Sequence, residues 1–381
     1  SLDKASLSVD VQLRNTGAAA AENQSVEVEL IDPAGKTVLI ERETFPTVSG
    51  GESEIRNLKS EIANPLLWHT EAPKLYTALI KLLDRGKVTE VIRQDVGFRR
   101  FEWDEKGNTY LNGKRYYMRG VNRSDCSPET GYTVDYADML KDALTMKELN
   151  IDSVRTSHNP NDIRWYAICN RLGITLVDEA NVEAHQHDVI FKSDAPSEEA
   201  WRKQSVWRML NMVQRDKNQP SVIIWSVGNE QFPPREDVPA IKAMYDLTKA
   251  IDPTRGVICE RGKEVLEYID LLAPMYGGEK EYVERYQQGT ERRPFFLSEY
   301  AHAMGNTDMK LEEKWDYFEE HDGLNGGHIW DWRDQSVYYP LPGLEGRHLT
   351  YGGDWSKHSG NDGTSCMNRR VLPDRGFTGK L

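Results

Sequence analysis

Two glutamates have the types and the spacing that hydrolytic chemistry needs. Glu230 closely follows the apolar run Val222–Ser226, and Glu299 directly follows the apolar run Phe295–Ser298. Two carboxyl groups that flank a glycosidic bond can hydrolyse it, because one donates a proton to the leaving oxygen while the other attacks the anomeric carbon. They stand about 5–5.5 Å apart for retention of configuration and about 6.5–9.5 Å apart for inversion. Either glutamate alone could be a salt-bridged rim residue, but the pair predicts a glycosidase.

Other polar and aromatic residues follow neighbouring apolar runs. Asn229 precedes Glu230 and could donate a hydrogen bond to a sugar 2-hydroxyl, or simply cap a loop. Tyr276 could reach Glu299 and hold its geometry, or serve only in packing. Four further residues could contact a hydroxyl or stack on a sugar ring, with a structural role as the alternative for each: His158, His302, Trp330 and Asp178.

A carboxylate and an imidazole are spaced as Glu-x-His at Glu183 and His185. Together with Glu230 they could bind Mg²⁺, which takes oxygen ligands and retains waters, although a hydrogen-bonded pair would explain the same spacing. A zinc hydrolase is the rival interpretation, but the chain has no His-Glu-x-x-His motif and no paired-cysteine spacing. The four cysteines are widely spaced and are expected to be buried free thiols: Cys126, Cys169, Cys259 and Cys366.

From residue 117 onward, apolar strand candidates alternate with helical patterns. The eight candidates are Met118–Asn122, Ser153–Ser157, Ile174–Asp178, Val222–Ser226, Val257–Cys259, Ile269–Pro274, Phe295–Ser298 and His328–Asp331. Eight buried strands separated by helices predict a (β/α)8 TIM barrel, in which the carboxyl ends of the strands converge on one site. An open doubly wound sheet would instead need a glycine-rich turn after its first strand, and that turn is absent.

The first hundred residues alternate between apolar and polar with a period of two. Leu7, Val9 and Val11 fall on one face of a strand, as do Val26 and Val28 on another. Short strands separated by turn signals predict an all-β antiparallel sandwich. We therefore expect two domains, residues 1–100 as the sandwich and residues 101–381 as the barrel.

Composition excludes several classes of partner. The net charge is −13, which argues against nucleic acid or an anionic membrane as the main partner. No run of 18 apolar residues occurs, so no segment is expected to span a membrane. The first residues lack the pattern of a signal peptide, and a cytoplasmic location is the favoured expectation.

Several strings together resemble glycoside hydrolase family 2, and within it the β-galactosidase branch. They are Gly120-Val121-Asn122-Arg123, Arg155-Thr156-Ser157-His158-Asn159-Pro160-Asn161, Asp178-Glu179-Ala180-Asn181-Val182-Glu183-Ala184-His185, Trp225-Ser226-Val227-Gly228-Asn229-Glu230, Ser298-Glu299-Tyr300-Ala301-His302-Ala303-Met304-Gly305-Asn306 and Trp330-Asp331-Trp332. The resemblance implies an immunoglobulin-like domain before the TIM barrel. It also implies an exo-acting, retaining enzyme that cleaves terminal β-D-galactosides through a covalent glycosyl-enzyme, with Glu230 as acid/base and Glu299 as nucleophile.

The same resemblance implies ligands for two cations and a sugar. It assigns Glu183, His185 and Glu230 to Mg²⁺, and it assigns Asn368 and the Ser365 carbonyl to Na⁺ beside the sugar 6-hydroxyl. The residues that would shape the sugar site are Asn229, Tyr276, His158, His302, Trp330 and Asn368. The expected substrate is a small-molecule or oligosaccharide β-galactoside.

Three departures from the family pattern qualify these expectations. Ser124 stands where the family has histidine after Gly-Val-Asn-Arg. The N-terminal jelly-roll domain and the C-terminal domains of the family are not in this sequence. We therefore expect an intact catalytic pair with reduced substrate affinity if the chain works alone, since orientation of the reactants is worth about 7–11 kcal/mol.

Two rival functions stay open at this point. The first is another family 2 enzyme, a β-glucuronidase or a β-mannosidase, although a glucuronidase would need cationic or amide groups for the sugar carboxylate and no candidate motif stands out. The second is a truncated or engineered barrel that binds sugar with little turnover. Linkage preference, aglycone and oligomeric state are undetermined, with a homo-oligomer among the alternatives.

Overall fold

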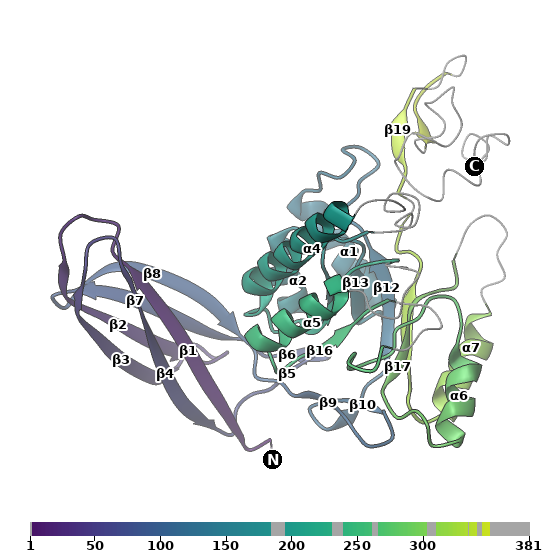
Figure 1. Ribbon diagram of the computed structural model, residues 1–381, viewed down its shortest axis with the longest axis horizontal. Helices are drawn as coiled ribbons and strands as arrows, with labels where there is room; N and C mark the ends of the chain where they lie inside the picture. The colour runs from purple at the N-terminus through teal and green to yellow at the C-terminus, as the bar shows by residue number, and fades with distance from the viewer. Residues whose placement is uncertain are drawn as a thin grey trace.

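The protein has two lobes, an all-β sandwich followed by a barrel with helices around it (Figure 1). The computed structural model describes residues 2–183, 195–230, 239–260, 266–302, 310–333, 335–340 and 345–350. This arrangement confirms the predicted fold class of an immunoglobulin-like sandwich before a TIM barrel. No helix in the described ranges is both long and apolar enough to cross a membrane.

The sandwich consists of two antiparallel sheets. One pairs β1 (Lys4–Arg14) with β4 (Ser53–Ala63), and the other has the order β3 (Thr37–Val48), β2 (Ala21–Ile31), β7 (Tyr76–Asp84), β8 (Lys87–Val96). Val26 and Val28 are 1% exposed and pack with Phe45 and Leu58 between the sheets, against Val9. The period-two pattern therefore predicted the buried face correctly.

The connection between the lobes is held by buried hydrogen bonds. Short strands lie here: β5 (Trp68–His69), β6 (Ala72–Pro73), β9 (Phe101–Trp103), β10 (Thr109–Leu111) and β11 (Lys114–Arg115). The fully buried Trp68 indole donates to the Asn170 carbonyl oxygen at 2.7 Å. Arg99 Nε donates to the Pro220 carbonyl oxygen at 2.7 Å. Both acceptors belong to the barrel, so these bonds tie the sandwich to the side of the barrel where its strands begin.

Seven parallel strands curl into the wall of the barrel. Their order is β16 (Gly256–Ile258), β15 (Val222–Ser226), β14 (Thr175–Glu179), β13 (Ser153–Thr156), β12 (Met118–Arg123), β18 (Leu324–Ile329) and β17 (Phe295–Tyr300). The predicted strand at Ile269–Pro274 does not form a regular strand, yet it bridges the two ends of the sheet. Asp270 N donates to the Val257 carbonyl oxygen, and Leu272 N donates to the Pro294 carbonyl oxygen. This segment therefore lies in the eighth position.

The last predicted strand, His328–Asp331, begins later in the sequence than the strand that the structure shows. The observed strand β18 begins at Leu324 and includes Asn325, Gly326 and Gly327. These small and polar residues do not look like a buried strand. Glycine is nevertheless needed at residue 327, because a Cβ there would lie 2.6 Å from the Leu297 carbonyl oxygen of the neighbouring strand.

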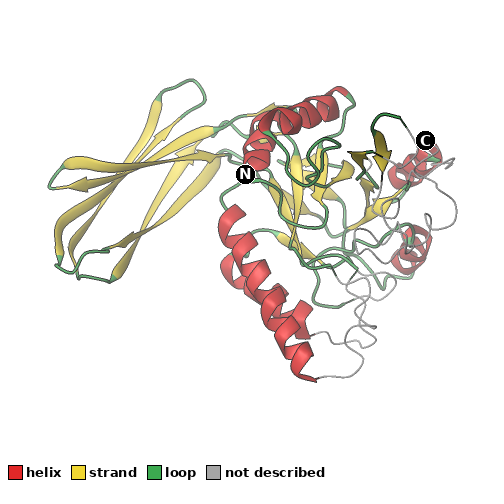
Figure 2. Cartoon of the chain, turned by 90° about the horizontal axis from the view of Figure 1, so that it is seen from above, coloured by secondary structure: helices red, strands yellow, loops and turns green. Residues whose placement is uncertain are grey.

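Helices surround the strands on the outside of the barrel (Figure 2). They are α1 (Tyr136–Glu148), α2 (Ile163–Leu172), α4 (Ala195–Asp216), α5 (Pro239–Ile251), α6 (Glu279–Gln287) and α7 (Leu311–Glu320); a short hairpin, β19 (Val337–Tyr339) with β20 (His348–Thr350), follows. Asp135 caps the N-terminus of α1, since its side chain accepts from Asp138 N at 2.8 Å. The apolar faces of α1, α2, α4 and α5 pack on strands of the wall in one core cluster.

Candidate active site

The candidate site is organised around one buried guanidinium, that of Arg155 at the carboxyl end of β13. The side chain is fully buried and donates to four neighbours at 2.7–3.0 Å. Its partners are Asn122 Oδ1 from β12, both carboxylate oxygens of Glu179 from β14, Glu299 Oε1 from β17 and Asn229 Oδ1 after β15. The ends of five strands thus meet at a single cation.

Charge compensation explains why this guanidinium tolerates burial. Burial by itself lowers the pKa of Arg155, but the carboxylates of Glu179 and Glu299 raise it more strongly. The same attraction, with a hydrogen bond from His158, lowers the pKa of Glu179 in spite of the burial that opposes ionisation. A buried charge is tolerated when it is paired and fully hydrogen-bonded, and here both conditions hold.

Both oxygens of the Glu299 carboxylate have a defined donor. Arg155 Nη1 donates to Oε1 at 2.8 Å, and the Tyr276 hydroxyl donates to Oε2 at 2.7 Å. The pKa of Tyr276 is raised, first by burial and then by the Glu299 charge. Glu299 is 4% exposed, and His158 Nε2 lies 3.9 Å from its Oε1. The Glu299 carboxylate is therefore buried, and both of its oxygens are held by side chains of the protein.

Glu230 lies next to Asn229 beyond β15, on the same side of the barrel. Asn229 Oδ1 accepts from the guanidinium that binds Glu299, so the residue that precedes Glu230 shares a partner with Glu299. The backbone of Glu230 is left-handed, with a φ of 43°. Its N–H donates to Glu260 Oε2 at 2.7 Å, which fixes the direction in which the side chain leaves the main chain.

The predicted metal ligands are only partly covered by the described residues. Glu183 forms a parallel bridge with Asn229 and its Oε2 accepts from Asn229 Nδ2 at 2.8 Å, so Glu183 and Glu230 follow adjacent strands at the rim. Two carboxylates there are compatible with a hard divalent cation. Within the described ranges no three potential ligands are grouped for a metal, and His185 lies outside those ranges. The Mg²⁺ site stays a prediction.

Aromatic rings lie beside Glu299. The ring of His158 stacks on Trp330 with centroids 5.0 Å apart and planes 10° apart. The ring of His302 lies 6.0 Å from that of Tyr276. The pKa of His302 is lowered because burial disfavours its cation. All four rings were predicted to shape the sugar site, and the structure gathers them around Glu299.

Comparison with known proteins identifies the family at this point. Residues 104–381 match the family described as "Glycosyl hydrolases family 2, TIM barrel domain", and residues 1–99 match "Glycosyl hydrolases family 2". The chain belongs to glycosyl hydrolase family 2. The resemblance that the sequence motifs indicated is thereby confirmed, whereas the boundary at residues 100 and 101 stays a prediction.

Curated proteins to which the chain is similar are bacterial β-galactosidases. The chain is 36% identical to the β-galactosidase of Photobacterium profundum over 94% of its own length and 36% of that protein. It is 41% identical to the enzyme of Vibrio cholerae over 82% of its own length and 31% of that protein. The family 2 chain thus spans about a third of the length of these relatives.

Solved structures share the fold at lower identity. A family 2 member from Bacteroides cellulosilyticus superposes with a TM-score of 0.72 at 24% identity, covering 87% of this chain and 44% of that one. The β-glucuronidase of Bacteroides uniformis gives the same TM-score at 20% identity, covering 87% of this chain and 44% of that one. At these identities the likeness shows the fold alone.

Asp178 of the family 2 motifs has the structural role that the sequence left open as the alternative to a sugar contact. Asp178 does not reach the rim, because its Oδ1 accepts from the Tyr166 hydroxyl of α2 at 2.6 Å. Successive strand residues point to opposite faces, so Glu179 points inward and Asp178 outward. Ser124, which replaces the family histidine, donates its hydroxyl to the Ser157 carbonyl oxygen at 2.8 Å. The Na⁺ residues Ser365 and Asn368 lie outside the described ranges.

Sequence reasoning gave no role to three residues that build this family 2 site. Arg155 and Glu179 stood inside recognised motifs, but no pattern showed which charged residue of each string points into the barrel. Glu260 had a usable signal, since it directly follows the predicted strand Val257–Cys259 in the way that Glu299 follows its own strand. It is 1% exposed, and its pKa is raised well above the ordinary range by burial, with Arg155 opposing and Glu299 adding to the rise.

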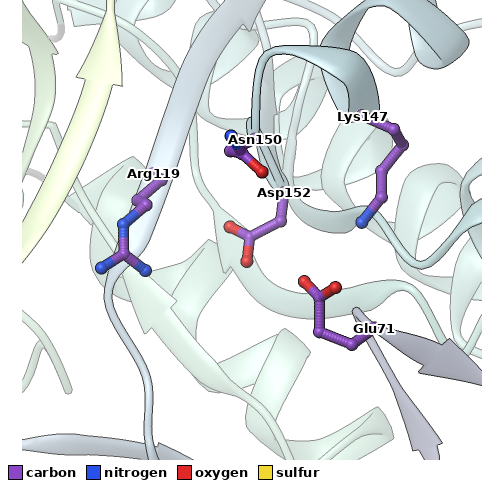
Figure 3. Close-up of a pocket in the computed structure, with 5 residues that line it drawn as sticks. All are labelled: Glu71, Arg119, Lys147, Asn150 and Asp152. Atoms are coloured by element: carbon purple, nitrogen blue, oxygen red, sulfur yellow. The ribbon is translucent and has the colours of Figure 1, made fainter.

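A pocket lies at the end of the family 2 barrel opposite the candidate site. It measures about 400 Å³ and is lined by Glu71, Arg119, Lys147, Asn150 and Asp152 (Figure 3). Asp152 immediately precedes β13, whereas Arg155 stands near the carboxyl end of that strand. TIM-barrel chemistry takes place at the carboxyl ends of the strands, so this pocket is not the candidate active site.

Proposed function

We propose that this chain carries the catalytic domain of a retaining glycosidase that removes terminal β-D-galactosyl groups. The observation that supports it most directly is the shared guanidinium of Arg155, which contacts Glu299 and the residue before Glu230. In this proposal Glu299, which Arg155 contacts, is the nucleophile, and Glu230 supplies the second carboxyl group. Galactose is the proposed sugar because the curated relatives are β-galactosidases.

In the first step Glu299 attacks the anomeric carbon while the glycosidic oxygen leaves. The bond from the anomeric carbon to the leaving oxygen breaks, a bond to the Glu299 carboxylate forms, and the Glu230 carboxyl transfers its proton to the leaving oxygen. Arg155 and Tyr276 hold Glu299 in position for this attack. The product of the step is a covalent galactosyl-enzyme and a free alcohol.

In the second step water replaces Glu299 on the sugar. Glu230, now ionised, takes a proton from the water, and the water oxygen forms its bond to the anomeric carbon as the bond to Glu299 breaks. Two inversions at one carbon give net retention. The Asn229 amide is proposed to donate to the 2-hydroxyl, an interaction that strengthens in the oxocarbenium-like transition state.

The aromatic rings and the cations complete the proposed site. His158, His302 and Trp330 would contact the sugar, with Trp330 and His158 already stacked on each other. Mg²⁺ would be held by Glu183, Glu230 and His185. A divalent cation there would favour the ionised form of the neighbouring acid and so tune its pKa. Asn368 and Ser365 are proposed for Na⁺ by resemblance only.

Covalent labelling of the nucleophile tests the proposal. Incubation with a 2-deoxy-2-fluoro-β-galactosyl fluoride should add one fluorogalactosyl group, because the fluorine at C2 slows both steps while the reactive leaving group speeds only the first, so the covalent intermediate accumulates. Intact mass spectrometry and peptide mapping should place the group on Glu299, and Glu299→Gln should stay unlabelled. A wild-type protein that takes up no label, or takes it up elsewhere, would overturn the mechanism.

Parallel assays on aryl glycosides test the sugar specificity. Aryl β-galactoside should be cleaved in preference to the matching β-glucuronide and β-mannoside. Glu230→Ala should keep activity on a substrate with a highly activated leaving group and should form β-galactosyl azide when azide is added, because azide needs no general base. Preferential cleavage of the glucuronide would replace galactose with glucuronic acid in the proposal.

A further inference from the structure

Glu260 is a buried acid that the two-step mechanism leaves without a role. It follows β16 (Gly256–Ile258) by two residues, next to the strand that precedes Glu230, and it is 1% exposed. Its Oε2 accepts the backbone N–H of Glu230 at 2.7 Å. A buried side chain of one strand end thus holds the main chain of the proposed acid/base residue on the next.

The backbone of Glu230 has a conformation that needs such support. Its φ of 43° lies in the left-handed region, which residues with a Cβ other than asparagine and aspartate rarely adopt. The preceding amide, that of Asn229, donates to the Val182 carbonyl oxygen at 2.8 Å on the side of β14. The two successive amides are therefore held from opposite sides, by Val182 and by Glu260.

We propose that Glu260 is a positioning residue for the proposed acid/base, Glu230. Its side-chain oxygen keeps the Glu230 backbone left-handed, and this conformation directs the Glu230 carboxyl group toward the glycosidic oxygen. The inference rests on the proposed function, since it concerns the proton donor of that reaction. This role requires an acceptor oxygen within hydrogen-bond distance of Glu230 N, and it does not require Glu260 to be ionised.

Two conservative variants test separately the length of the side chain at residue 260 and its ionisable carboxyl group. Glu260→Gln keeps an acceptor oxygen at the same distance and removes the ionisable carboxyl group, whereas Glu260→Asp keeps a carboxyl group and withdraws the oxygen by one methylene. Positioning therefore predicts near wild-type behaviour for Glu260→Gln and a defect for Glu260→Asp. Asp152→Asn is the matched control, a buried acid at the other end of the barrel.

The experiment measures how kcat/KM depends on the leaving group of the substrate. A misplaced proton donor slows the cleavage of phenyl β-galactoside, whose leaving group needs protonation, more than that of dinitrophenyl β-galactoside, whose leaving group does not. For Glu260→Asp we expect kcat/KM to fall about 100-fold on the phenyl substrate and less than about 3-fold on the dinitrophenyl substrate, the scale of a displacement near 1 Å. Fluorosugar labelling of Glu299 should keep its wild-type rate, because it needs no proton donor.

Several outcomes would overturn this role. Equal losses on both substrates would indicate a general structural effect, and a defect in Glu260→Gln as large as or larger than that in Glu260→Asp would show that an acceptor oxygen at this distance is not what the role requires. If the wild-type protein is not labelled at Glu299, the proposed function fails first. Crystal structures of wild type and Glu260→Asp then test the contact by itself: a Glu230 φ that stays near its wild-type value in the variant contradicts positioning by Glu260.

Discussion

At the scale of the residue, the two oxygens of Glu299 have donors of different kinds. Arg155 brings a full positive charge to Oε1, and the Tyr276 hydroxyl brings a neutral donor to Oε2. The raised pKa of Tyr276 means that the phenol keeps its proton beside the carboxylate, so its role is to donate a hydrogen bond. When Glu299 attacks, its charge decreases and both bonds weaken together, so orientation is their main contribution.

Removal of the phenol tests this assignment. Tyr276→Phe leaves Oε2 without its donor, and a hydrogen bond to a charged group is worth about 1.5–3 kcal/mol. We expect the rate of fluorosugar labelling at Glu299 to fall about 10- to 100-fold. The melting temperature should change little, because 48% of Tyr276 is already exposed. An unchanged labelling rate would show that Arg155 alone orients the carboxylate.

At the scale of the element, the alternation of side chains along each strand decides which charges enter the barrel. In β14 the neighbours Asp178 and Glu179 are both acids, yet one contacts Tyr166 of α2 and the other contacts Arg155. In β13 the guanidinium of Arg155 fills the interior directly beneath the mouth. A shift of one residue in either strand would exchange these positions and dismantle the site.

Close packing of strands below the site makes a further test. A Cβ on Gly120 of β12 would lie 2.3 Å from Cδ2 of His328 of β18, whose fully buried ring bonds to Ser153 Oγ at 2.9 Å. Gly120→Ala should therefore lower the free energy of unfolding by about 1–3 kcal/mol, the usual cost of overpacking a core. Denaturant unfolding followed by circular dichroism measures it.

The cause can be isolated with a double-mutant cycle. His328→Ala removes the ring that the new methyl group would strike, so the added cost of Gly120→Ala should shrink in that background. Equal costs in both backgrounds would mean that the backbone of residue 120, and not contact with His328, is responsible.

At the scale of the whole molecule, the two ends of the barrel have separate tasks. The sandwich is tied to the end where the strands begin, through Trp68 and Arg99, while the candidate active site occupies the other end. The pocket lined by Asp152 belongs to the first of these ends (Figure 3). Substitutions in this pocket should alter the stability of the protein without altering the proposed glycosidase reaction.

The titration of Asp152 provides a test of this separation, because it should change stability with pH without changing turnover. Burial raises its pKa to about 6 from an ordinary 3.8, so the folded protein binds a proton there more tightly than the unfolded chain does. The stability contributed by that proton is complete below about pH 4 and is lost as the pH rises through about 6. At pH 7.5 the full loss is about 3 kcal/mol, an order-of-magnitude value.

Asp152→Asn removes this titration and should make the difference visible. The variant should be more stable than wild type at pH 7.5, and its advantage should diminish as the pH is lowered to 4. Thermal unfolding of both proteins across this range measures the difference, and turnover at pH 7.5 should be unaffected. A stability difference independent of pH would show that Asp152 does not titrate in this interval.

Much of the fold could be predicted from the sequence, and the sequence also led to the proposal of a catalytic pair. Apolar periodicity distinguishes the sandwich from the barrel, because a period of two and buried runs separated by helices leave different patterns along a chain. Glu230 and Glu299 could be proposed because each follows a strand whose carboxyl end must lie at the rim. Apolar periodicity and the position of a residue just after a strand both involve residues close together in the sequence, so they can be recognised from the sequence itself.

Only the tertiary structure decided how the site is connected. That Arg155 joins Glu299 to Asn229, that Glu260 holds the Glu230 amide and that Asp178 points away depend on which strands lie side by side and on which face each side chain emerges. The sequence did not indicate the full strand Leu324–Ile329 for the same reason. Its glycines are needed because backbone atoms from segments distant in the sequence lie too close for a Cβ. Contacts between distant segments leave no periodic trace in a single chain, so the folded arrangement alone determines them.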